Sequence, residues 1–205
     1  MKRFYLNDDQ KPCIWPVPDD CLWTGENCET RNGVNIEYEG PYEKEADYLY
    51  GEMEMMGLAV KKKKNNKIST IILMPSNTGI FETGGYALDV NFSGTIIKSS
   101  NAEGILNGCR TLLQLIDHGF DGSVSGVHIT DTPKKSFRGL KISFPADGDM
   151  DRLKKSIKIA GKWKYNKVIL CLKRYYDVLH FDILNYDKPG NYQLENSKLN
   201  YNKLH

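Results

Sequence analysis

The segment from Gly84 to Ile116 constrains the fold more than any other part of the sequence. Its first part alternates apolar and polar residues with period two, which is typical of a half-buried β-strand. Ser93-Gly94 predicts a tight turn, and the β-branched run Thr95–Ile97 predicts a short return strand. The apolar face of the first strand would carry Tyr86, Leu88, Val90 and Phe92. The pattern therefore predicts an antiparallel hairpin.

A helix is expected directly after this hairpin. Ser100 stands three residues before Glu103, a spacing that predicts a capping box at the first turn of the helix. Gly104 and Gly108 lie one turn apart and lower helix propensity, so we expect the helix to approach a neighbouring backbone closely there. Apolar residues recur at helical spacing and predict one buried face: Ile105, Cys109, Leu112, Leu113 and Ile116.

This segment resembles the small domain that precedes the barrel in family 20 glycoside hydrolases, the β-N-acetylhexosaminidases. In that family a strand Y-x-L-x-V, a glycine turn, a second strand and a helix with G-x-x-T-L-x-Q-L follow one another. An extended I-x-D-x-P and an aromatic-R-G motif then open the first barrel strand. The matching residues are Tyr86, Leu88, Val90, Gly94, Gly108, Thr111, Leu112, Gln114 and Leu115, then Ile129, Asp131, Pro133, Phe137, Arg138 and Gly139.

The part of the chain up to residue 131 is predicted to form an α+β domain. Residues 1–33 are rich in proline and turn formers, which indicates an irregular lead-in. Residues 34–131 mix strands and helices without strict alternation, which favours a mostly antiparallel sheet with two helices on one face. The expected strands are 34–38, 58–60 and 68–74, and a first helix has Ala46, Leu49, Met53 and Met56 on its apolar stripe and ends at Gly57.

Residues 137–184 are predicted to form the start of a barrel. Leu140, Ile142 and Phe144 alternate as a strand, Asp149 can cap a following helix, and residues 167–172 form a short apolar strand. Strand, helix and strand make one right-handed βαβ unit, whereas a (β/α)8 barrel takes about 250 residues. We therefore expect an incomplete TIM barrel, followed by a poorly ordered tail at residues 185–205.

The resemblance implies a hydrolytic reaction, but the residues that carry it out in the family do not occur in this sequence. Family members hydrolyse terminal N-acetylhexosamines with the substrate acetamide as nucleophile, a Glu as general acid and an adjacent Asp. No H-x-G-G-D-E motif occurs in this sequence, so no catalytic residue and no cofactor are predicted. Arg138 matches the family arginine that binds sugar hydroxyls; its alternative role is a structural ion pair. Ser143 and Ala146-Asp147 depart from the family pattern around this strand.

Composition limits the partners that the chain could have. A net charge of +2 over 205 residues gives no electrostatic reason to expect nucleic-acid binding. The run Lys61–Lys67 is basic, but without interleaved aromatic residues it is best interpreted as a solvated loop. No stretch is apolar enough to span a membrane, and the first ten residues lack the apolar centre of a signal peptide. As written, the sequence predicts a cytoplasmic protein, or an exported one if the true N-terminus lies upstream.

Cysteine and histidine residues give no strong metal signal. Cys13, Cys21 and Cys28 lack a C-x-x-C pair and a nearby His, so no metal site is predicted and free thiols are expected. Cys109 and Cys171 are expected to be small buried hydrophobes. His118, His128 and His180 have no obvious partners in the sequence and are interpreted as structural.

Three functions remain open from the sequence. The first is the N-terminal part of a β-N-acetylhexosaminidase-like enzyme, not catalytic by itself, whose ligands would be N-acetylhexosamine glycans. The second is a non-enzymatic carbohydrate-binding or interaction module, for which Trp15, Trp23 and Trp163 are candidate contacts. The third is an enzyme with an unrecognised site. The incomplete barrel would leave Leu140, Ile142, Val168, Leu170 and Leu172 partly uncovered, which predicts self-association.

Overall fold

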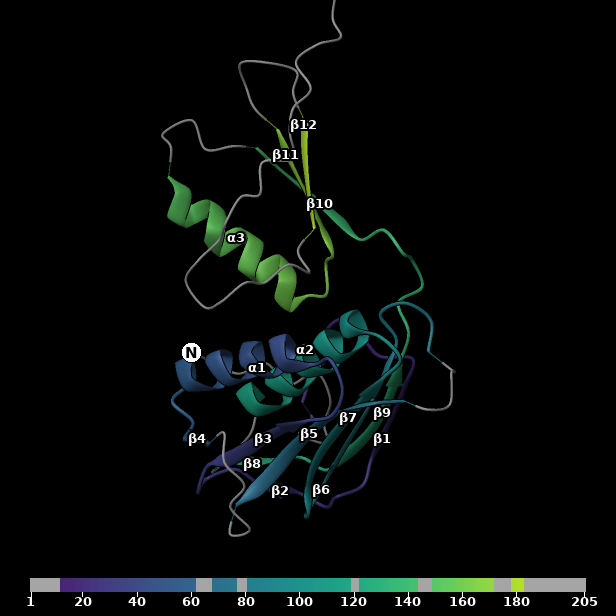
Figure 1. Cartoon of the computed structure of the whole chain (residues 1–205), viewed down its shortest axis with the longest axis vertical. Coiled ribbons are helices and arrows are strands. Elements are labelled where there is room, and N and C mark those ends of the chain that lie inside the picture. The colour runs from purple at the N-terminus through teal and green to yellow at the C-terminus, as the bar shows by residue number, and fades with distance from the viewer. Residues whose placement is uncertain are drawn as a thin grey trace, which may run out of the picture.

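A seven-stranded mixed sheet forms the framework of the N-terminal part of the protein (Figure 1). The computed structural model describes residues 12–61, 68–76, 81–118, 122–143, 149–171 and 178–182. In spatial order the strands are β1 (Asp20–Trp23), β9 (Val127–Asp131), β6 (Tyr86–Asn91), β7 (Gly94–Ser99), β5 (Ser69–Pro75), β3 (Val34–Tyr38) and β4 (Val60–Lys61). The first four strands in this order pair antiparallel with one another, and the pairs from β7 to β4 are parallel.

The predicted hairpin is present, with its turn one residue earlier than expected. Tyr86, Leu88 and Val90 are fully buried, as their alternation predicted. Asn91 pairs with Gly94, so Phe92 and Ser93 form the loop, and Phe92 is 75% exposed rather than on the buried face. The Asn91 side chain accepts a hydrogen bond from the Ser93 amide at 2.8 Å, which favours this tight turn.

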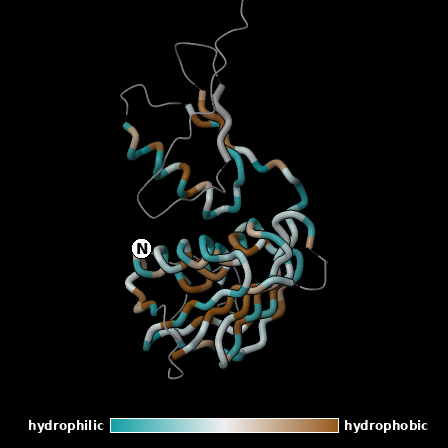
Figure 2. Tube along the Cα trace, in the orientation of Figure 1, coloured by the Kyte–Doolittle hydropathy of each residue, from teal (hydrophilic) through white to brown (hydrophobic). Residues whose placement is uncertain are grey.

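Two helices cover one face of the sheet, as predicted, and confirm the α+β class. They are α1 (Glu43–Met55) and α2 (Ala102–His118). Ala46, Leu49 and Met53 of α1 are buried, whereas Met56 lies just past the helix and is 38% exposed. Hydrophobic segments gather in the strands and in the helices beside them (Figure 2). The main core therefore lies between the helix pair and the sheet.

The N-terminus of α2 differs from the predicted capping box. The Asn101 side chain, not Ser100, accepts from the Gly104 amide at 2.9 Å. Ser100 instead donates to the Phe81 carbonyl at 2.8 Å, and Glu103 pairs with Arg138. Asn is as good an N-cap as Ser, and the shift of the cap by one residue moves the capped amide from Glu103 to Gly104.

The segment predicted to be an irregular lead-in contains two short strands. β1 pairs with β9 and forms one edge of the large sheet. β2 (Cys28–Glu29) pairs with β8 (Ser123–Val124). Three of the four residues of β1 are exposed, so the segment has no buried alternation that could have identified it as a strand. Residues 1–11 and the basic residues 62–67 lie outside the described parts of the chain.

The predicted βαβ unit follows the domain. β10 (Gly139–Ser143) and β11 (Lys167–Cys171) are parallel, and α3 (Met150–Lys162) connects them. Asp149 caps α3 by accepting from the Arg152 amide at 2.9 Å, as predicted. β12 (Val178–Asp182), which the sequence did not indicate, pairs antiparallel with β11. Phe144, Leu172 and the tail at 185–205 are outside the described residues.

The expected apolar patch on the barrel strands is only partly exposed. Val168 and Leu170 are 1% and 2% exposed because they pack with Leu153 and Ala160 of α3. Leu140 and Ile142 are half-buried against the same cluster. The helix thus covers the face that these residues share. No helix within the described ranges is long and apolar enough to cross a bilayer.

We expect the protein to lose stability at alkaline pH, because ionisable side chains are buried in its core. Burial raises the pKa of Tyr48 to about 12, although positive Arg110 nearby opposes the shift, and burial also raises the pKa of Cys109. Because the pKa of Tyr48 is higher in the folded protein than in the unfolded chain, its contribution to stability is complete below the unfolded pKa of about 10. This contribution is lost as the pH rises towards the folded pKa. We expect Tyr48 alone to contribute about 2–3 kcal/mol of this loss.

The measurement is urea unfolding at neutral pH and at a pH between the two Tyr48 pKa values. Tyr48→Phe should lose less stability between them than the wild type does. Equal losses in both proteins would contradict the assignment to Tyr48.

Candidate functional site

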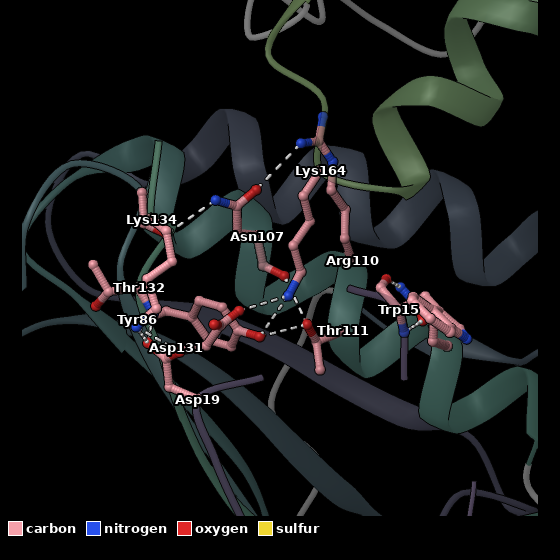
Figure 3. A network of polar contacts seen from close by, with 12 residues as sticks. Trp15, Asp19, Tyr86, Asn107, Arg110, Thr111, Asp131, Thr132, Lys134 and Lys164 are labelled. Carbon is pink, nitrogen blue, oxygen red and sulfur yellow. Dashed lines mark hydrogen bonds and ion pairs between the residues drawn. The ribbon is translucent and has the colours of Figure 1, made fainter. Parts of the chain in front are cut away.

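The junction between the α+β domain and the βαβ unit holds a buried polar network (Figure 3). Lys164, in the loop after α3, is 3% exposed. Its Nζ donates to Asp131 Oδ2 at 2.9 Å and to the Tyr86 hydroxyl at 2.8 Å. The Tyr86 hydroxyl also bonds Thr111 at 2.7 Å. A lysine of the C-terminal unit therefore inserts between β6, β9 and α2 of the domain.

The pKa directions in this network follow from burial. Desolvation lowers the pKa of Lys164, and the carboxylate of Asp131 opposes that shift. Burial raises the pKa of Tyr86, and the negative charge of Asp131 adds to the effect. Tyr86 therefore stays a neutral hydrogen-bonding group, and Asp131 is the counter-ion that keeps a buried ammonium tolerable.

Arg138 is the second anchor of the junction. Its Nη2 pairs with Glu103 of α2, and the two side chains are 18% and 9% exposed. Its Nε donates to the Lys164 carbonyl at 2.9 Å and its Nη1 to the Lys135 carbonyl at 2.7 Å. Asn166 accepts from the Arg138 amide at 2.9 Å. This arrangement corresponds to the structural ion pair that the sequence left open as an alternative.

A third contact joins α3 to α1. Lys158 Nζ lies 2.8 Å from Glu52 Oε1, and Lys162 Nζ lies 3.9 Å from Glu52 Oε2. Glu52 is 6% exposed. In all three contacts the acid belongs to the α+β domain and the base to the βαβ unit or its linker. The junction is thus complementary in charge.

Arg110 of α2 is a buried cation that sequence reasoning missed. It is 2% exposed, and its Nη1 donates to Asn107 Oδ1 at 3.3 Å. Asn107 in turn donates to the Gly84 carbonyl at 2.9 Å. Arg110 lies in the same turns of α2 as the buried apolar residues. A charged residue among apolar ones in a helix was the only sequence signal of its burial.

A pocket of about 870 Å³ opens beside this junction. Its walls come from the lead-in, the linker before β10 and the loop after α3, and they are mostly apolar. Trp15, Phe137 and Trp163 are 56%, 55% and 58% exposed there. The remaining lining residues are Pro16, Lys134, Lys135, Arg138, Gly139 and Tyr165.

The residues singled out in the sequence are thus only partly brought together. Trp15, Trp163 and Arg138 line the pocket, whereas Trp23 packs against the main core. His128 contacts Asp89 through Nδ1 on the sheet, away from the pocket. Nothing is described for the side chains of His118 and His180. Within the described ranges, no group of three or more His, Cys, Asp or Glu side chains is placed to hold a metal ion.

The comparison with protein families decides the identity of the domain. Residues 11–132 match the model described as glycosyl hydrolase family 20, domain 2. The chain belongs to glycosyl hydrolase family 20. The match begins before β1 and covers residues 11–33 of the segment that the sequence predicts to be a lead-in. No curated protein sequence matches the chain.

Solved family-20 enzymes share the fold. The β-N-acetylhexosaminidases of Bacteroides fragilis NCTC 9343 and Streptomyces coelicolor A3(2) match with TM-scores of 0.66 and 0.64 and identities of 20% and 23%. An exo β-N-acetylglucosaminidase of Vibrio harveyi matches with a TM-score of 0.64 and 21% identity. Each match covers 77% of this chain but only 32%, 34% and 25% of those chains, in that order. The family-20 chain therefore spans about a quarter to a third of their length.

Proposed function

We propose that this chain supplies the N-terminal domain and the first βαβ unit of a glycoside hydrolase that removes terminal N-acetylhexosamines. The observation that carries the proposal is the family-20 domain followed directly by the parallel pair β10 and β11. The solved relatives are β-N-acetylhexosaminidases and β-N-acetylglucosaminidases, and those of Vibrio harveyi and Streptomyces plicatus are in complex with N-acetylglucosamine. The ligand class proposed here is accordingly an N-acetylhexosamine glycan.

Sugar binding by Arg138 stays a prediction within this proposal. A guanidinium has five N–H groups, and three of those in Arg138 donate to Glu103, Lys164 and Lys135. Arg138 immediately precedes β10, at the N-terminal end of the strand. Any contact with a sugar would have to use the other N–H groups, without breaking the junction.

The purified 205-residue chain is expected not to hydrolyse aryl N-acetyl-β-glucosaminides or galactosaminides. The family reaction needs a carboxylic acid as proton donor, and the sequence has no Asp-Glu motif to provide it. Release of the aryl group would be followed by absorbance. Activity that copurifies with the chain and survives Arg138→Ala would point to a different site.

The proposal itself is tested in cells of the source organism. Antibodies raised against this chain should precipitate activity on an aryl N-acetyl-β-glucosaminide, and an excess of the purified chain should compete it away. The immunoreactive band should have a higher molecular mass than the 23.4 kDa of this chain. Precipitates that contain the chain but release no N-acetylhexosamine would overturn the proposal.

We also propose that the isolated chain self-associates through the βαβ unit. β10 lies at the edge of its three-stranded sheet, and an open edge offers unpaired N–H and C=O groups to another strand. Light scattering over a concentration series should show a rising mass. A strictly monomeric species at all concentrations would exclude this association. No nucleic-acid or membrane partner is proposed.

A further inference from the structure

The junction pocket has the features of a binding site that the family-20 assignment does not explain. Large aromatic side chains bury most of their surface in ordinary cores, and clustered exposed ones mark interaction sites. Trp15, Phe137 and Trp163 each leave more than half of their surface exposed around one pocket. The volume of about 870 Å³ lies within the range of about 300–1,000 Å³ typical of small-molecule sites.

One side chain fixes both tryptophan segments. Gln114 of α2 accepts from the Trp15 amide at 2.8 Å and donates to the Trp15 carbonyl at 2.7 Å. The same Nε2 lies 3.4 Å from the carbonyl of Lys162, the residue before Trp163. The lead-in and the end of α3 are therefore held in place before any ligand arrives. Such preorganisation lowers the entropy lost on binding.

The pocket lies at the end of the βαβ unit opposite to the expected chemistry. It is lined by Phe137, Arg138 and Gly139 at the start of β10, and by Trp163 and Tyr165 before β11. In (β/α)8 barrels the active site is built at the C-terminal ends of the strands. A ligand in this pocket would thus be bound away from the catalytic face, and a sugar contact of Arg138, which also lines the pocket, would belong to this ligand and not to the sugar that reacts.

We propose that this pocket is an accessory carbohydrate-binding site for β-linked N-acetylglucosamine oligosaccharides. Exposed indole and phenyl faces fit the apolar C–H faces of pyranose rings. The Lys135 ammonium and the indole N–H groups can donate to hydroxyl and acetamide oxygens. Lys134 is held by Asp19, with Nζ 2.7 Å from Oδ1, and frames the rim. The choice of sugar rests on the proposed function, whereas the site itself rests on the pocket.

The test is a titration of the full chain with chitotetraose, followed by the indole N–H signals in ¹H–¹⁵N NMR spectra. The Trp15 and Trp163 signals should shift saturably, and the Trp23 signal should not. Trp163→Ala should weaken binding at least tenfold, and Trp15→Ala should do the same. The matched control Trp23→Phe should bind within about twofold of the wild type. Cellotetraose, which lacks the acetamides, should bind more weakly than chitotetraose.

Three results would overturn the proposal. The first is the absence of saturable shifts in a chain whose spectrum is that of a folded protein. The second is equal weakening by Trp23→Phe and Trp163→Ala. The third is a change of the Trp15 and Trp163 signals with protein concentration instead of with sugar, which would assign the pocket to a second copy of the chain. The immunoprecipitation of hydrolase activity does not depend on this pocket, so the two proposals can fail separately.

Discussion

Replacing Asp131 with Asn is expected to destabilise the full chain by about 3–5 kcal/mol, because it removes the counter-ion of a buried ammonium. Lys164 is 3% exposed, and its Nζ lies 2.9 Å from Asp131 Oδ2. Asn is nearly isosteric, so packing changes little and the loss reports on charge. The measurement is the free energy of unfolding from urea titrations monitored by circular dichroism.

The control for Asp131→Asn is the double variant Asp131→Asn/Lys164→Met. Met removes the uncompensated charge and keeps most of the side-chain volume, so the double variant should be more stable than Asp131→Asn alone. A loss below about 1 kcal/mol in Asp131→Asn would match an exposed surface pair and contradict a buried one.

Gly104→Ala is expected to destabilise the domain by about 3 kcal/mol, the upper end of ordinary overpacking costs. A Cβ on Gly104 would lie 2.1 Å from the Gly85 carbonyl oxygen and 2.1 Å from Ser99 Oγ. The backbone of Gly85 is held by two hydrogen bonds, because its amide donates to the Glu82 carbonyl and its carbonyl accepts from the Ser99 hydroxyl. The unfolding free energy of the variant measures the cost.

Gly108→Ala is the matched comparison on the same helix. Its Cβ would meet Ile97 Cγ2 at 2.5 Å, which is a side-chain atom and not a backbone oxygen. Gly108→Ala should therefore cost less than Gly104→Ala. The reverse order, or no loss in either variant, would show that α2 does not approach the hairpin as described.

The sequence predicted those parts of the fold in which apolar residues recur at the spacing of a strand or a helix and are buried on one face. The alternation of Tyr86, Leu88 and Val90 and the helical spacing of Ile105, Cys109 and Leu112 identified β6 and the buried face of α2. Asp149 was recognised as a cap because capping is local. The close approach of α2 at its two glycines was predicted because glycine lowers helix propensity, so two glycines within a helix indicate a packing reason for them.

The missed features depend on partners far away in the sequence. β1 is mostly exposed and pairs with β9 more than 100 residues later, so its own residues have no strand period. The parallel pairing of β5 with β3 and β7 is likewise not encoded locally. Asn101 rather than Ser100 caps α2 because Ser100 bonds to the Phe81 carbonyl in a neighbouring loop.

The junction was predicted in part. Asp131 and Arg138 were identified through the family motifs, but their partners Lys164 and Glu103 were not. Lys164 lies in a loop, adopts a φ of +60° and looks like a surface lysine in the sequence. Its burial follows only from the docking of the βαβ unit onto the domain.

Amide hydrogen exchange of the full chain, read by mass spectrometry, most directly tests the claim that the βαβ unit docks on the family-20 domain through these charge pairs. In the wild type, peptides from α3 and β11 should be protected, because Lys158, Lys164 and Arg138 hold the unit on Glu52, Asp131 and Glu103. In Asp131→Asn, α3 and β11 should lose protection more than β6 and β7 do. Wild-type peptides from α3 and β11 that exchange as fast as unfolded chain would contradict the docked structure.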